Sequence, residues 1–111
     1  MTVLWVALGG ALGSSIRYLL SLALTRGSFP AGTLAVNVLG CFAAGWLAGR
    51  LDPASAWRSF WIPGVLGGFT TFSAFGLEAR AMGATAVAAA YVTLSLALGL
   101  GAVWLGGGLS R

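Results

Sequence analysis

The residues best suited to chemistry in this sequence lie in one stretch, where aromatic rings alternate with hydroxyls directly after a run of glycines. The rings recur every three positions and share a helix face, and the hydroxyls stand between them: Phe69, Phe72, Phe75, Thr70, Thr71 and Ser73. An aromatic ring has a negative face and a positive edge, so its edge favours an anion. Hydroxyls add hydrogen-bond donors. With few acidic groups nearby, the pattern predicts a site that passes a small anion; the alternative is that the rings only pack against neighbouring helices.

The residues before these rings are poor helix formers. Pro63 lacks an N–H and clashes with the preceding turn, and Gly64, Gly67 and Gly68 each lower helix propensity by about 1 kcal/mol relative to alanine. We therefore expect a helix interrupted over about 63–70, near mid-membrane, where irregular backbone is tolerated only if protein or water-filled space surrounds it. An interruption frees backbone carbonyls, and freed carbonyls suit a hard cation such as Na⁺.

Two other segments carry polar side chains on a helix face. Asn37 shares a stripe with Cys41 and two glycines at a spacing of four, and its amide is costly in lipid unless it is hydrogen-bonded. We interpret Asn37 either as a donor that lines an ion pathway or as a hydrogen bond between helices. Tyr91 and Ser95 form a second, partly polar stripe. That stripe is weak evidence alone, because hydroxyls in membrane helices often bond their own backbone.

Charged side chains inside the apolar segments are rare. Arg17 lies on the same face as Gly9 and Gly13, where it serves either as an interfacial anchor or as a cation that attracts anions. Glu78 lies toward the end of the third segment and has Arg80 or Arg17 as candidate partners. We therefore assign Arg17 and Glu78 electrostatic and structural roles.

The composition places the chain among membrane proteins. Of its 111 residues, 59% are hydrophobic and 7% are charged, with a mean hydropathy of +0.95, whereas a soluble domain carries roughly 25% charged residues. The net charge of +4 does not indicate nucleic-acid binding, because the six arginines are scattered at segment ends. One cysteine and no histidine argue against a disulfide, a transition-metal site and an enzyme.

At about 20 residues per crossing, this length suits four transmembrane helices in a single domain over 1–111. We expect an all-α membrane protein whose third helix is the broken one, with helices at about 3–24, 31–50, 54–83 and 84–106. The start of the chain supplies no positive region of a signal peptide, so the first segment is expected to remain as a helix.

The arginines give almost no signal for orientation in the membrane. Three of them fall on the membrane face that carries the N-terminus, against two or three on the other face. An excess of positive residues on one face normally sets the orientation of a membrane protein, and here that excess is almost absent. We therefore expect insertion in both directions. A bundle of four helices also has little interior, so a pathway forms more easily between two copies. Two copies in opposite orientations can then pair as a dual-topology dimer; the alternative is that so short a chain lacks the arginine bias by chance.

Three motifs resemble the Fluc (CrcB) family of fluoride channels: GGALGSSIRY at 9–18, GTLAVNVLGCFAAG at 32–45 and, most specifically, GVLGGFTTFSAFGLE at 64–78. The resemblance extends over the whole chain. It implies passive fluoride export across the cell inner (plasma) membrane by a multi-pass channel, with two pores at the interface of an antiparallel homodimer. Fluoride, a second copy of the chain and membrane lipid are the expected partners.

The resemblance also implies roles for single residues. It assigns a structural Na⁺ at the dimer centre to the backbone carbonyls of Gly67 and Thr70. It assigns the fluoride pore to six residues: Asn37, Thr71, Phe72, Phe75, Tyr91 and Ser95. We add Ser73 to the pore because its hydroxyl is a hydrogen-bond donor next to these residues. Ala74 and Gly99 stand where the family often has hydroxyls, which shortens the expected polar track.

Two other functions compete with the channel. A small multidrug-type exporter also has four short helices in a dual-topology dimer, but it needs a membrane-embedded carboxylate for proton exchange, and the first segment has none. A non-transporting membrane scaffold subunit explains the small-residue stripes. It does not explain a glycine run followed by hydroxyls and rings.

Overall fold

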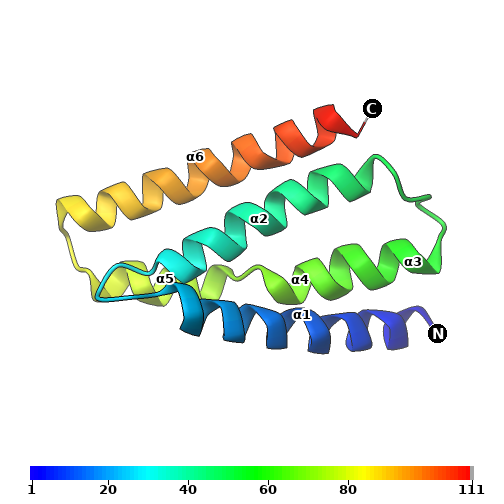
Figure 1. Cartoon of the computed structure of the whole chain (residues 1–111), viewed down its shortest axis with the longest axis horizontal. Coiled ribbons are helices and arrows are strands. Elements are labelled where there is room, and N and C mark those ends of the chain that lie inside the picture. The colour runs from blue at the N-terminus through cyan, green and yellow to red at the C-terminus, as the bar shows by residue number, and fades with distance from the viewer. Residues whose placement is uncertain (111) are drawn as a thin grey trace.

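The computed structural model describes residues 1–110, all of whose regular elements are helical. Seven elements follow one another along the chain: α1 (Thr2–Leu24), α2 (Ala31–Ala48), α3 (Ala56–Ser59), η1 (Phe60–Leu66), α4 (Gly67–Phe69), α5 (Phe72–Ala81) and α6 (Ala86–Leu109). The short elements α3 to α5 run in one direction and together form one long segment. Figure 1 shows this segment beside α1, with α2 beside α6 as the other pair.

Four helical segments are long and apolar enough to cross a membrane, by length and composition: Thr2–Leu24, Ala31–Ala48, Ala56–Ala81 and Ala86–Leu109. Their mean hydropathy over the best window lies between 1.3 and 1.9. At about 1.5 Å per residue, the 18 residues of the shortest segment reach about 27 Å, close to the thickness of a hydrocarbon core. The prediction of four long apolar helices is confirmed.

The helix interruption falls at the end of the predicted range, 63–70, and not at the proline and glycines within it. Pro63 lies inside η1, a π-helical stretch of seven residues, and helical turns continue through Phe69. The wider π turn accommodates a proline ring that would meet the carbonyl four residues earlier in an α-helix. Regular backbone stops only at Thr70 and Thr71, which are both extended, with ψ angles of 156° and 123°.

The glycines before this interruption serve close packing instead of breaking the helix. A Cβ at Gly13 in α1 would overlap the backbone carbonyl of Val65, and one at Gly68 would lie 2.5 Å from the Gly10 carbonyl oxygen. On the other side of the bundle, a Cβ at Gly45 would overlap the Val103 carbonyl. Small residues thus let α1 approach η1 and α4, and α2 approach α6, at backbone distance.

Candidate functional site

The centre of the candidate site is a reciprocal pair of hydrogen bonds between α2 and the interruption. The amide nitrogen Nδ2 of Asn37 donates to the Thr71 carbonyl at 3.0 Å, and the Thr71 N–H donates to Oδ1 of Asn37 at 2.8 Å. One side-chain amide therefore satisfies both backbone groups of an extended residue, as a neighbouring strand would. Asn37 keeps a second Nδ2–H beyond this pair. The sequence identified Asn37 and Thr71 separately, and the structure brings them together.

The Thr71 side chain begins the next helix. Its hydroxyl oxygen accepts from the Ala74 N–H at 3.1 Å and lies 3.3 Å from the Ser73 hydroxyl. This is the N-cap arrangement that threonine favours, because it satisfies one of the free N–H groups of the first turn. The Thr71 hydroxyl thus fixes the direction of α5 while lying next to a second hydroxyl.

The bonds of the Thr71 N–H to Asn37 and of the Ala74 N–H to the Thr71 hydroxyl leave two backbone carbonyls without their usual helical donors. In a continuous helix the Thr71 N–H would bond the Gly67 carbonyl, and the Ala74 N–H would bond the Thr70 carbonyl. Both N–H groups are donated elsewhere, to Asn37 and to the Thr71 hydroxyl. The carbonyls freed in this way belong to the two residues that the family resemblance assigns to Na⁺, and hard oxygen ligands suit such a cation.

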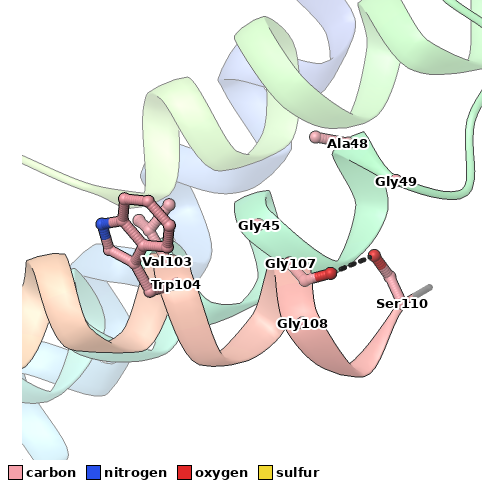
Figure 2. A pocket seen from close by; sticks show the side chains of 8 residues that line it. All are labelled: Gly45, Ala48, Gly49, Val103, Trp104, Gly107, Gly108 and Ser110. Carbon is pink, nitrogen blue, oxygen red and sulfur yellow. Dashed lines mark hydrogen bonds between the residues drawn. The ribbon is translucent and has the colours of Figure 1, made fainter.

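Gly67 and Thr70 also line a common hollow of about 200 Å³. Its other lining residues come from η1, α2 and α6: Ile62, Leu66, Gly40, Cys41, Ala44 and Val103. Val103 also lines a second hollow, of about 500 Å³, which lies between the C-terminal ends of α2 and α6. Figure 2 shows this second hollow, lined largely by glycines and walled by Trp104. It contains none of the residues that the sequence singled out as site residues.

The aromatic residues of the site form a chain of ring contacts. Phe72 and Phe75 lie 5.6 Å apart between ring centroids, and Phe75 lies 5.2 Å from Tyr91 on α6. Their surroundings differ sharply, since Phe72 is 80% exposed and Phe75 is 8% exposed. Most of the Phe75 ring is therefore covered by its own chain, whereas most of the Phe72 ring is exposed on the surface of that chain. Phe69 is at the end of α4, beside Gly40.

Two hydroxyls on α6 are buried without a hydrogen-bond partner among the described residues. They are Oη of Tyr91, in a fully buried residue, and Oγ of Ser95 one turn further along. A buried hydroxyl without a partner costs roughly 1–3 kcal/mol. Tyr91 has the Thr33 hydroxyl and the Glu78 carboxylate close by, so Ser95 is the clearer case of a hydroxyl that calls for water or a ligand. The spacing drew attention to both residues, and the family resemblance assigned them to the pore.

Glu78 has a partner that the sequence analysis missed. Oε1 of Glu78 accepts from the Thr33 hydroxyl at 2.7 Å, instead of pairing with Arg80 or Arg17 as expected. Thr33 is itself buried, at 4% exposure. Thr33 lies four residues before Asn37, so it extends the stripe of Asn37 and Cys41 by one helical turn. This spacing was the sequence signal that could have identified it.

Arg17 binds the backbone at the end of α4. Its Nε donates to the Gly68 carbonyl at 3.1 Å, and the Ser14 hydroxyl donates to the same oxygen at 3.4 Å. Cationic donors stabilise the carbonyl end of a helix. Arg17 therefore has a structural contact on α4, and Ser14, which the sequence analysis did not select, supports it.

The chain is similar to known proteins over nearly all of its length. The family model described as "CrcB-like protein, Camphor Resistance (CrcB)" matches residues 4–107. A protein of Agrobacterium fabrum is 46% identical over 116 residues, covering 96% of this chain and 93% of its own length. One of Solibacter usitatus is 46% identical over 121 residues, covering 100% and 99%. Both relatives carry the name "Fluoride-specific ion channel FluC".

Proposed function

Because the chain belongs to the CrcB-like protein family, we propose that it is a fluoride-specific ion channel that exports fluoride passively across the cell inner (plasma) membrane. The observation that carries this proposal is the 46% identity over whole chains to proteins named as fluoride-specific ion channels. Four helices with the length and composition of membrane spans agree with it. A channel of this kind lowers a barrier for an ion and is not an enzyme.

The ion path that we propose follows the residues around the interruption. Hydroxyls and the free Nδ2–H of Asn37 replace part of the water around the anion, and the edges of Phe72 and Phe75 replace another part. Two observations support this path: the ring contacts that join Phe72 through Phe75 to Tyr91, and the unpartnered hydroxyls of Tyr91 and Ser95. Conduction also requires that each contact be weak enough for the ion to leave.

We further propose that the working unit is an antiparallel, dual-topology homodimer with two pores at the interface. Phe72 supports this, because an 80% exposed ring at the start of α5 encloses no path within one chain, whereas a second copy would supply the opposite wall. The nearly balanced arginines agree with insertion in both orientations.

The same dimer would hold one structural Na⁺ through the carbonyls of Gly67 and Thr70 from both copies. The fit is chemical: the structure directs the two N–H donors away from these carbonyls, and both residues line one hollow on the surface of the chain. When bound, the cation would supply the positive charge that joins carbonyl oxygens of the two copies. Asn37 and Thr71 hold those oxygens free of helical partners.

The decisive experiment is fluoride efflux from liposomes that contain the purified chain, followed with a fluoride electrode and compared with chloride efflux. We expect rapid fluoride efflux and little chloride efflux. A chain that releases neither ion, although it is purified as a stable dimer, would contradict the channel and leave the scaffold subunit as the better description. Proton-coupled export of organic cations without fluoride flux would favour the exporter.

A further inference from the structure

A cluster of aromatic rings lies outside the ion path, at the end of the bundle where α1 and α3 begin. Trp5 on α1, Trp57 on α3 and Phe60 at the start of η1 line a cavity of about 130 Å³, with Ala56 as the fourth wall. In Figure 1 this is the end of the bundle that carries the N-terminus.

The rings meet at right angles. Phe60 lies 6.1 Å from Trp5 and 5.9 Å from Trp57 between centroids, with interplanar angles of 88° and 84°. These three rings, set at steep angles to one another, make up most of the lining of the cavity. The face of an aromatic ring carries the negative part of its quadrupole.

The cavity is open to a group from outside, since Trp57 is 61% exposed and Trp5 is 39% exposed. Two arginines near this end of the bundle are engaged elsewhere. Nη1 of Arg58 donates to the carbonyls of Ala48 and Leu51 at the end of α2, and the Arg50 guanidinium stacks 4.5 Å from the centroid of the Trp46 ring.

We propose that Trp5, Trp57 and Phe60 form a binding site for the alkylammonium group of a zwitterionic phospholipid headgroup. Ring faces attract cations, and cages of aromatic rings are the usual receptors for quaternary ammonium groups. The place fits the ligand, because tryptophans near the ends of membrane helices lie at the depth of the headgroups. An acyl chain would also pack against these rings, but it would do so whatever headgroup it carries, so a preference for one headgroup is the signature of this site. It is separate from the proposed ion path and its test does not depend on fluoride transport.

The test measures lipids that remain bound to the purified protein by native mass spectrometry. The protein is incubated with equal amounts of phosphatidylcholine and phosphatidylglycerol that have identical acyl chains, so that the lipids differ only in the headgroup. We expect preferential retention of phosphatidylcholine. Trp57→Leu and Phe60→Leu should each lower its retention by about two- to fivefold, the range for one cation–π contact at an exposed site, with phosphatidylglycerol unchanged.

Trp104→Leu is the matched control, because Trp104 is another exposed tryptophan near a helix end and is not part of the cavity. It should leave the preference intact. Equal loss of both lipids in Trp57→Leu, or the same loss in Trp104→Leu, would overturn the site in favour of general interfacial anchoring. A second measurement uses the unmodified protein, so that it does not depend on folding of a variant. Tetramethylammonium should displace bound phosphatidylcholine and uncharged neopentyl alcohol should not; equal displacement by both would refute recognition of the charge.

Discussion

Replacing Asn37 with leucine tests the link between α2 and the interruption. Leucine has similar volume and keeps the helix, but it removes both bonds to the Thr71 backbone, which measure 3.0 Å and 2.8 Å. Leaving a buried polar group unpartnered costs about 1–3 kcal/mol. The Thr71 N–H and carbonyl are only part-buried, so we take a cost of about 1–2 kcal/mol for each of them, or about 2–4 kcal/mol in total.

A change of this size shifts the equilibrium between the state in which the Thr71 backbone is bonded to residue 37 and the state in which it is free. The shift is about 30- to 700-fold, since every 1.4 kcal/mol is a factor of ten. The Thr71 N–H would then be free to bond the Gly67 carbonyl and extend α4. We expect fluoride efflux from liposomes to fall at least tenfold. We also expect the Thr71 amide to change its rate of hydrogen exchange, which reports the lost bond directly.

The control is Leu39→Ala, also on α2. Leu39 is 56% exposed and does not line the hollow of Gly67 and Thr70, so this variant should keep most of the efflux and the exchange rate of Thr71. Dimer content is checked by gel filtration for each variant. Near-normal efflux in Asn37→Leu, together with unchanged exchange at Thr71, would refute the reasoning that Asn37 holds this backbone in place.

Three other predictions follow from the same geometry. Phe72→Ile removes a ring that is 80% exposed, so it should sharply lower fluoride efflux without loss of dimer; Phe75→Ile should lower efflux too, with a further packing cost of up to about 1.5 kcal/mol. Normal efflux in both variants would reduce these rings to packing residues. Gly13→Ala places a Cβ against a backbone carbonyl of η1 and should destabilise the chain by about 1–3 kcal/mol or more in thermal unfolding, whereas Gly101→Ala, which meets nothing within 4 Å, should be neutral. Exchange of Na⁺ for a large organic cation should lower the unfolding temperature of the dimer, because a ligand that binds only the folded form stabilises it by mass action; an unchanged temperature would argue against a structural Na⁺.

The sequence was sufficient for the class of protein and for the number of its long helices. Long apolar segments separated by turns have few structural solutions in a membrane, because every backbone group must be bonded internally. The resemblance to the CrcB family rested on local motifs, which are readable without a structure, and the family model confirms it. Residues such as Asn37, Tyr91 and Ser95 were recognisable because polar groups at helical spacing are rare in apolar helices.

The place of the interruption was decided by tertiary structure. Proline and glycine lower helix propensity, yet Pro63, Gly64 and Gly68 remain helical because η1 widens its turn and α1 packs closely against the two glycines. Regular backbone ends at Thr70 and Thr71, where Asn37, 34 residues earlier in the chain, offers Thr71 better partners than the helix does. Propensity is a local quantity of about 1 kcal/mol per residue, and two hydrogen bonds to a distant amide are of comparable size. Whether the helix continues depends on the sum of helix propensity and these distant hydrogen bonds. The hydrogen bonds form only where α2 meets the interruption, and the tertiary structure decides where that is.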